Sequence, residues 1–572
     1  MRKGLISSCV GLLIVFAVGL PAATYWSGQQ LEAELRYALA ALQGTPGVEV
    51  EDVELHRGLR RTELRFTLHP GDALEGLHRQ ELERAGFPSA TRDFHVQVSV
   101  DHGPIVLRDG RPRAGIAAGR FQVSEPQPHL DRKYGSRHPE PGIGEFLVSL
   151  SGQMKGTFHQ PAFEGEAWTS LEGVPADLPY RLRTAADHYQ YRYRPDDGAL
   201  QLSGTIGEVH VEWLHGQELT TDAGTLEASG HLRRDTYRIA YRIGMDALRL
   251  KMVVPPALQE FRDLVVSGEM AGPGSGLQRL DAMLSIGRWD YQSEGDRLSG
   301  DSLRFSGNAA RAEDGVWFGG LALALGPSLA DIDADPEGPF AMEEASLRLG
   351  VDEGVNGVDV SLDLQFAVAS QGRVNAGVSH SGRLAVEGLD RPALAALTRD
   401  LERALEGVPH GAEVVLGRLE ELLIDSAGHV PDLLRGEPAL VVGPLDLVVR
   451  DQSMRLEARF PVQLEWLQQF GATGLFWPQA GLRGELAMER GLLPVMAAAL
   501  APYGAGDTPL GGMPLEQQVE FVVLGMLGMG LLTEDDGTLR MGWRVDGEQL
   551  LVNDTLDMTA EYQAILYQLL AF

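Results

Sequence analysis

The sequence predicts an α+β protein in which antiparallel β-structure predominates. Apolar and polar residues alternate with a period of two through most of residues 146–385, the pattern of strands with one apolar face. Glycine makes up 69 of the 572 residues and lies mostly between these alternating runs, where hairpin turns need a positive φ. Leucines at helical spacing are concentrated near residues 31–42 and after residue 389. A one-faced sheet of this length predicts a long, twisted antiparallel meander.

Four segments follow from these patterns. We expect a transmembrane helix at residues 1–26, an amphipathic helix at 27–43, a β-rich region at 44–386 and an α+β region at 387–572. The apolar stripe of the amphipathic helix consists of Leu31, Leu35, Leu39 and Leu42. This stripe is expected to pack on the following sheet, and a dimer seam is the alternative.

The first segment is uncharged and mostly apolar from residue 4 to residue 26. At 1.5 Å per residue, this length spans the ~30 Å hydrocarbon core of a bilayer. Arg2 and Lys3 predict a cytoplasmic N-terminus, so we expect a single-pass protein of a bacterial inner membrane with its C-terminal region in the periplasm. The side chains expected to hold this anchor in the membrane are Leu5, Leu12, Leu13, Phe16, Tyr25 and Trp26.

A cleaved signal peptide is the main alternative to an anchor. Ala17 and Gly19 are small residues at a spacing suited to cleavage, but the apolar run continues beyond them. A lipoprotein box ending at Cys9 is disfavoured, because the apolar run follows this cysteine and does not precede it. Cys9 is the single cysteine of the chain, so an internal disulfide is excluded.

The alternating runs and leucine stripes give the expected elements. Strands are expected at residues 48–55, 62–68, 94–100, 146–150, 189–193, 237–243, 303–305, 347–351 and 358–366, with 439–441 and 445–449 pairing with 454–460, and a final pair at 539–545 and 549–552. Helices are expected at residues 74–85, 391–405, 413–423, 492–500 and 517–532, and at the C-terminus. The apolar run 521–532 is too short to span a bilayer and is expected to be buried core.

The charge balance limits the partners. The formal net charge is −31, and the only lysines are Lys3, Lys133, Lys155 and Lys251. A chain this acidic repels the phosphates of nucleic acids and the anionic headgroups of lipids. We therefore expect no nucleic-acid binding, and attachment to the membrane through the N-terminal helix.

Asp101 and His102 are the most prominent candidates for catalysis, because an adjacent carboxylate and imidazole can perform general acid–base chemistry. Neighbouring strand residues point to opposite faces, so the two side chains diverge unless the strand has ended, as Gly103 and Pro104 suggest. An Asx-type hydrogen bond from Asp101 accounts for this sequence without catalysis. We therefore interpret Val100, Asp101, His102, Gly103 and Pro104 as a structural turn.

Two clusters share some features with metal sites. Asp331, Asp333 and Asp335 alternate as in a calcium loop, but residues 336 and 342 are Pro and Met where such a loop needs Gly and Glu. A second group, His210, Glu212 and His215, lacks the helical spacing of a zinc site. No metal is expected.

The glycine-rich stretch at residues 272–276 is not followed by the lysine of a phosphate-binding loop. It also lacks the strand–glycine–helix order of a dinucleotide site. A hairpin turn or linker is the better interpretation, and no cofactor is expected.

The order of these segments resembles the YdgA family of bacterial inner-membrane proteins of unknown biochemical function. The resemblance is carried by His56-Arg57-Gly58 before a strand, by the stretch Val100-Asp101-His102-Gly103-Pro104, and by residues 434–438 and 441–445. One departure is the closing turn, where Asn553 is followed by Asp554 and not by glycine. The resemblance implies an inner-membrane protein that can self-associate, with links to envelope-dependent behaviour such as surface motility. It supplies no catalytic residues.

Three functions remain open on this basis. The first is a non-enzymatic envelope protein whose sheet forms an apolar groove for acyl chains or another hydrophobic ligand. The motivation is that the apolar face of the long sheet must be covered, while few helices are expected before residue 389. The alternative is a scaffold with a filled core that acts through partners or as a homodimer. A periplasmic hydrolase, the third, rests only on Asp101 and His102.

Overall fold

The computed structural model describes Leu39 and residues 48–58, 61–70, 94–102, 105–108, 111–115, 117–124, 140–149, 151–169, 178–213, 216–233, 236–253, 255–273, 277–332, 339–371, 377–405, 429–462, 481–495, 514–546 and 549–562. The chain divides into two compact units. The first contains Met1–Glu294 and Leu401–Ile424, and the second contains Gly295–Asp400 and Asp425–Phe572.

The first unit is built on an antiparallel sheet in which most neighbours in space are neighbours in sequence. Its strands pair in the order β1 (Val48–Arg57), β2 (Arg61–Pro70), β3 (Phe94–His102), β6 (Ala117–Ser124), β7 (Gly142–Val148), β8 (Met154–Gln160), β11 (Asp187–Arg194), β12 (Ala199–Ile206), β15 (Gly224–Leu232), β16 (Thr236–Val253), β17 (Pro256–Pro273) and β18 (Arg279–Ser293). The antiparallel meander predicted for this region is therefore confirmed.

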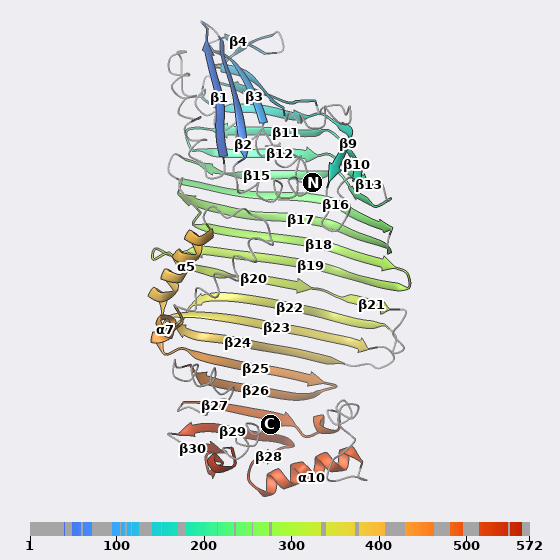
Figure 1. Cartoon of the computed structure of the whole chain (residues 1–572), viewed down its shortest axis with the longest axis vertical. Helices are drawn as coiled ribbons and strands as arrows, with labels where there is room; N and C mark the ends of the chain where they lie inside the picture. Colours follow the sequence, from blue (N-terminus) through green and yellow to red (C-terminus); the bar gives the residue numbers. More distant parts are fainter. Residues whose placement is uncertain are drawn as a thin grey trace. The chain divides into compact units, whose positions relative to one another are not determined.

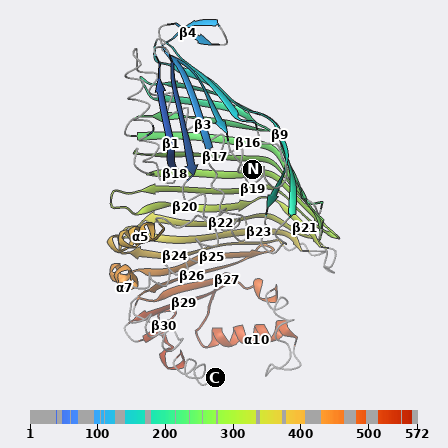
Figure 2. The same ribbon diagram turned by 45° about the horizontal axis from the view of Figure 1, so that its top comes forward.

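The first unit also contains strands that are not part of this main pairing order. A ladder of β9 (Phe163–Thr169), β10 (Leu178–Thr184), β13 (Val209–Trp213) and β14 (Glu218–Thr221) rejoins the sheet at β16. The hairpin of β4 (Ile105–Arg108) and β5 (Arg111–Ala114) forms a separate small sheet. Within the unit, β1–β3 are steeply inclined to β16–β18 in both views (Figures 1 and 2). This inclination is the accumulated twist of many antiparallel strands.

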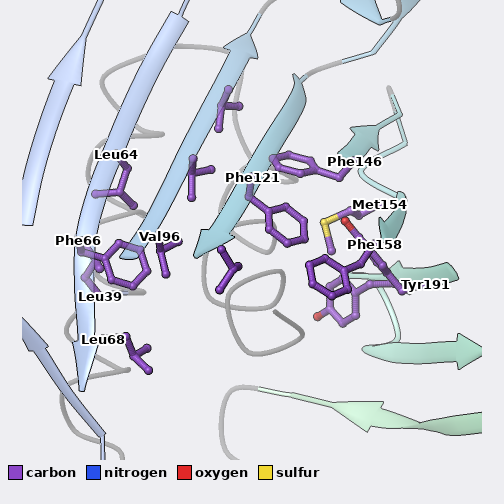
Figure 3. Close-up of a cluster of buried hydrophobic side chains, with 14 of the residues drawn as sticks. Leu39, Leu64, Phe66, Leu68, Val96, Phe121, Phe146, Met154, Phe158 and Tyr191 are labelled. Atoms are coloured by element: carbon purple, nitrogen blue, oxygen red, sulfur yellow. The ribbon is translucent and has the colours of Figure 1, made fainter. Parts of the chain in front are cut away.

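The core of the first unit is formed by one face of the sheet. On β2, Thr62, Leu64, Phe66 and Leu68 are all buried, as their alternation predicts. Leu64, Phe66 and Leu68 point into the same space as Phe121, Phe146, Phe158 and Tyr191 from later strands (Figure 3). Leu39 is buried in this core as well, so this position of the predicted leucine stripe packs against the sheet. The other predicted stripe residues lie outside the described residues.

Several glycines lie inside strands of this sheet, so their predicted placement between strands is wrong at these positions. Gly144 lies opposite Phe121 on the neighbouring strand, and Gly119 lies opposite Phe146. A Cβ atom added at either glycine would overlap the opposing ring. Glycine is therefore required here for close packing of an aromatic side chain over the backbone, a role that spacing along one strand does not reveal.

The second unit is also an antiparallel meander. It contains β19 (Asp296–Arg311), β20 (Trp317–Leu325), β21 (Ser328–Ile332), β22 (Phe340–Glu353), β23 (Val358–Gln371), β24 (Val378–Leu389), β25 (Ala439–Val449), β26 (Gln452–Pro461), β27 (Arg483–Glu489), β28 (Thr533–Asp535), β29 (Thr538–Asp546), β30 (Gln549–Val552) and β31 (Leu556–Asp557). β20 and β21 together fill the place between β19 and β22. From β22 to β27 the strands pair in chain order, and β27 pairs with β29. The predicted pairing of β25 with β26 and of β29 with β30 is confirmed.

The predicted helix at residues 391–405 is α5 (Arg391–Leu405). The Asp390 carboxylate accepts a hydrogen bond from the Ala393 N–H at 2.9 Å, which caps its N-terminus. Arg391 forms ion pairs with Asp314 and Glu353, and its guanidinium lies 5.3 Å from the centre of the Phe318 ring. In Figures 1 and 2, α5 and the short α7 (Val430–Leu433) lie at the strand ends of this unit, beside its sheet.

The helix α10 (Leu515–Gly528) differs from the prediction in two ways. It ends at Gly528, four residues before the predicted end, and Gly530 has a left-handed φ of 75°. The prediction that residues 521–532 are buried core is wrong for most of them. Val523 and Leu532 are buried with Leu539 of β29, whereas Phe521 is 60% exposed. From Phe521 onward the helix sequence is apolar on all sides, so it does not show which face is covered.

The predicted membrane anchor cannot be located on this fold. Leu5, Leu12, Leu13, Phe16, Tyr25 and Trp26 lie outside the described residues, as do the predicted helices at 74–85 and 413–423. In the part of the chain that the structure describes, no helix combines the length and the hydropathy needed to cross a bilayer.

Candidate ligand-binding face

The second unit exposes an apolar face on strands β19 to β24. Cross-strand register aligns Phe305, Leu323, Leu347 and Leu364 in one row across β19, β20, β22 and β23. A second row aligns Leu321, Leu349, Leu362 and Leu384 across β20, β22, β23 and β24. Residues two apart on a strand share a face, so both rows lie on the same side of the sheet. We call these eight residues the leucine rows.

Every side chain of the leucine rows is exposed, from 38% for Leu362 to 50% for Leu321. Partly buried apolar residues extend the face on both sides, for example Phe366 on one flank and Val360 on the other. Monomeric soluble proteins rarely leave an apolar patch of this kind in water, so such a patch is a typical sign of a binding surface.

The opposite face of the same strands is polar. Ala322 lies between two of the exposed leucines of β20 but points to the other side, where its cross-strand neighbour is Arg348. Asp363 and Arg383 continue that row, with 4.0 Å between the Asp363 carboxylate and the Arg383 guanidinium. The alternation predicted from the sequence is therefore realised as two chemically distinct faces.

The dimensions of the face suit an extended hydrocarbon chain. Adjacent strands are about 4.8 Å apart, so the four intervals from β19 to β24 cover about 19 Å. One leaflet of a bilayer has a hydrocarbon depth of about 15 Å, half of the ~30 Å core. An acyl chain lying across these strands would therefore contact aliphatic side chains along its whole length.

The first unit has a related apolar row that is closed at one end. Tyr189, Gly204, Leu226, Ile243 and Val266 are aligned from β11 to β17. Tyr189 is 5% exposed inside the core, whereas Val266 is 37% exposed. The apolar face of this unit is thus covered by its own strands at β11 and open at β17.

The motif at residues 100–104 lies at the end of β3. Val100 is buried in the core, while Asp101 lies opposite Arg61, 3.9 Å from its guanidinium. His102 is opposite Ala117 and lies on the other face of the strand from Asp101. The two side chains therefore diverge and do not form an acid–base pair. Gly103 and Pro104, and any Asx-type bond to them, lie outside the described residues.

His102 has an unusual environment. Its Nε2 atom is buried, and neither this atom nor the buried hydroxyl of Thr62 has a hydrogen-bond partner among the described residues. Burial lowers the pKa of His102 below its ordinary value, and nearby Arg57 lowers it further against the opposing effect of Asp101. The imidazole is therefore held in its neutral form more strongly than an exposed histidine would be.

The predicted metal clusters are only partly described. Asp331 lies on β21, while Asp333 and Asp335 are outside the described residues. His210 and Glu212 lie on β13, where His210 Nδ1 is 3.1 Å from the Thr220 hydroxyl, and His215 is outside. Within the described ranges, no group of three His, Cys, Asp or Glu side chains is arranged to hold a metal ion.

One cluster of titratable groups could not be found by sequence reasoning. The rings of His159 and His188 stack with 4.3 Å between their centres, because the two residues are cross-strand neighbours on β8 and β11. Beside them, the buried Asp187 carboxylate accepts hydrogen bonds from the Gly207 N–H at 2.6 Å and the Tyr189 hydroxyl at 3.3 Å. Burial raises the pKa of Asp187, and these hydrogen bonds oppose that shift only in part. Finding this cluster requires the register of β8 against β11.

The fold and this face define an antiparallel β-sheet protein with a solvent-exposed apolar surface. Residues 1–253 match the family described as a bacterial protein of unknown function, DUF945. This part of the chain is therefore similar to bacterial proteins whose function is not known. Comparisons with curated proteins and with solved structures gave no match.

Proposed function

We propose that this chain is a non-enzymatic, membrane-anchored envelope protein of the YdgA type that holds lipid acyl chains against its leucine rows. The exposure of all eight side chains of these rows is the observation that carries the proposal. Burying exposed apolar surface is worth about 25 cal/mol per Å², so covering the rows with a hydrocarbon chain is favourable.

The chemistry of the face favours an aliphatic ligand. Seven of its eight residues are leucines and the other is Phe305, so the rows themselves offer no hydrogen-bonding side chain to a polar ligand. A site built for a polar small molecule places a few polar groups among the apolar ones. An acyl chain needs none.

The proposed location supplies such a ligand. The predicted anchor, with Leu12, Phe16 and Trp26 among its residues, would hold the chain at the periplasmic surface of the inner membrane. The family match spans this N-terminal segment, which supports treating the anchor as part of the protein's organisation. Phospholipids would then be within reach of the apolar face.

Native mass spectrometry of the full chain, with lipid extraction of the same sample, tests the proposal. We expect phospholipid or fatty acid at stoichiometric amounts on the wild-type protein. The double variant Leu323→Glu/Leu347→Glu should lose it, because two carboxylates would be desolvated beneath an acyl chain. Ala322→Glu adds a carboxylate on the opposite face of the same strand and should retain the lipid. A lipid-free wild-type protein would contradict the proposal.

A self-associating scaffold is the second candidate, and α10 favours it. Phe521, Val522, Leu524 and Met529 are each more than half exposed, and Gly525 leaves open space around its Cα. An apolar helix face with a small residue can pack closely against a second copy. The variant Phe521→Ser/Leu524→Ser should convert a dimer to a monomer in light scattering. A wild-type chain that is already monomeric at high concentration would exclude this candidate.

A further inference from the structure

A second surface of the first unit has the opposite character to the leucine rows. The polar face of β8, β11, β12, β15 and β16 contains a hollow of about 690 Å³. Two parallel rows of side chains form its walls. One row begins with Lys155, Arg192 and Gln201, and the other begins with Thr157, Gln190 and Ser203. We call this hollow the cross-strand trough.

The trough places two positive charges directly opposite each other. Lys155 on β8 and Arg192 on β11 are cross-strand neighbours, and both are exposed. Like charges directly opposite each other on neighbouring strands destabilise a sheet. Neither side chain forms an ion pair with any described residue, although the chain carries 80 acidic residues against 49 basic ones. Within the described part of the chain, no carboxylate is therefore paired with either cation.

Two other cations of the trough strands form ion pairs, and the third cation of the trough, Arg242, is the cross-strand neighbour of Glu227. Arg194, two residues after Arg192 on β11, forms an ion pair with Asp197 at 2.8 Å. Lys251 on β16 forms one with Glu218 at 2.8 Å. A cation pair that lacks such a carboxylate can accept the anionic group of a ligand without first breaking an internal ion pair.

The rest of the trough suits a hydroxyl-rich chain. Five strands at about 4.8 Å spacing give it a length of about 19 Å, and residues two apart on a strand give a width of about 7 Å. The walls beyond the cations carry side-chain amides and hydroxyls, namely Gln190, Gln201, Ser203 and Ser229. Arg242 closes the far end, opposite Glu227. These groups can donate and accept hydrogen bonds along an extended ligand.

We propose that the cross-strand trough binds an anionic oligosaccharide, with an acidic group of the sugar held between Lys155 and Arg192. A linear chain of sugars matches the narrow, open shape and the hydroxyl- and amide-lined walls. The acidic group supplies the charge that the like-charged pair lacks. This site lies on the polar face of the first unit, so it does not depend on lipid binding by the leucine rows of the second.

Isothermal titration calorimetry of the full chain in detergent tests this proposal with tetragalacturonate as the probe and neutral maltotetraose as its uncharged counterpart. We expect saturable binding of tetragalacturonate and at least tenfold weaker binding of maltotetraose. Lys155→Gln/Arg192→Gln should weaken tetragalacturonate binding at least tenfold. The control Lys251→Gln/Arg262→Gln removes the same charge from two side chains that already form ion pairs, and should change affinity less than twofold.

All four substituted side chains are exposed, so both double variants should fold and keep the wild-type circular dichroism spectrum. A difference in affinity between them then reports on the removed charges and not on unfolding. Absence of saturable tetragalacturonate binding overturns the proposal. So does equal binding of the two sugars, or an equal effect of the two double variants, since the anionic group would then not be recognised by Lys155 and Arg192.

Discussion

Phe121 on β6 lies over the backbone of Gly144 on β7, and the two residues are direct cross-strand partners. Phe146 covers Gly119 in the reciprocal arrangement two pairs further along the same two strands. The Phe121 ring also stacks on Phe158, with 5.7 Å between ring centres. The core of the first unit thus depends on two positions where any side chain larger than hydrogen is excluded.

The first prediction concerns this packing. Gly144→Ala should destabilise the first unit by about 1–3 kcal/mol, because the new methyl group forces the Phe121 ring out of its position. Urea unfolding followed by circular dichroism measures the change. Adding Phe121→Leu should recover part of the loss, whereas Gly525→Ala, at a site with open space, should not destabilise the chain. A Gly144→Ala variant as stable as the wild type would contradict this account.

The second prediction compares one chemical change at two leucines of the C-terminal region. Leu539 is 1% exposed in the cluster with Val523 and Leu532, so Leu539→Ala should cost about 2–5 kcal/mol of unfolding free energy. Leu524 is 54% exposed on α10, so Leu524→Ala should change the unfolding free energy by less than about 0.5 kcal/mol. Similar losses for both variants would mean that the outer face of α10 is covered.

The third prediction follows from the lowered pKa of His102. The unfolded chain binds a proton at this residue near its ordinary pKa of about 6.5, before the folded chain does. The contribution of His102 to stability is therefore present above about pH 6.5 and is lost as the pH falls toward the folded pKa. His102→Gln should reduce the difference in urea midpoint between pH 7.5 and pH 5.5. An unchanged difference would show that His102 does not titrate in this way.

The fourth prediction concerns Asp187, whose effect on the pH dependence of stability has the opposite sign to that of His102. Burial raises the pKa of Asp187 in the folded chain above its unfolded value of about 3.9. The folded state therefore binds the proton more readily, and this contribution to stability decreases as the pH rises from about 4 through the folded pKa. Asp187→Asn should remove that decrease. Asp197→Asn is the control, because the pKa of Asp197 is lowered, mainly by the Ala199 N–H, and its pH dependence runs the other way.

Much of the fold could be predicted from periodicity. The alternation on β2, the run of tyrosines on β11 and the leucine stripe of α5 each identify an element correctly, because one face or stripe of each is apolar. Strand lengths were less predictable. β16 and β17 each contain 18 residues and pass through glycines that resemble turn signals. Gly268 on β17 is required because a Cβ there would contact Asp281 on the next strand.

The candidate sites were harder to predict from the sequence, because they depend on the register in which the strands pair. Leu323 and Leu347 are 24 positions apart in the sequence, and only the pairing of β20 with β22 places them side by side. The same holds for Lys155 and Arg192 across β8 and β11. The sequence predicts that an apolar face exists, but a shift of one residue in any pairing would change which side chains meet on it.

Photo-crosslinking in living cells tests the central claim most directly. A benzophenone amino acid is placed at Leu323, on the leucine rows, or at Ala322, on the opposite face of the same strand, and the full-length protein is irradiated and analysed by mass spectrometry. The account predicts a mass increase corresponding to a phospholipid or fatty acid for the probe at position 323 and none at position 322. No lipid adduct at position 323, or equal adducts at both positions, would contradict it.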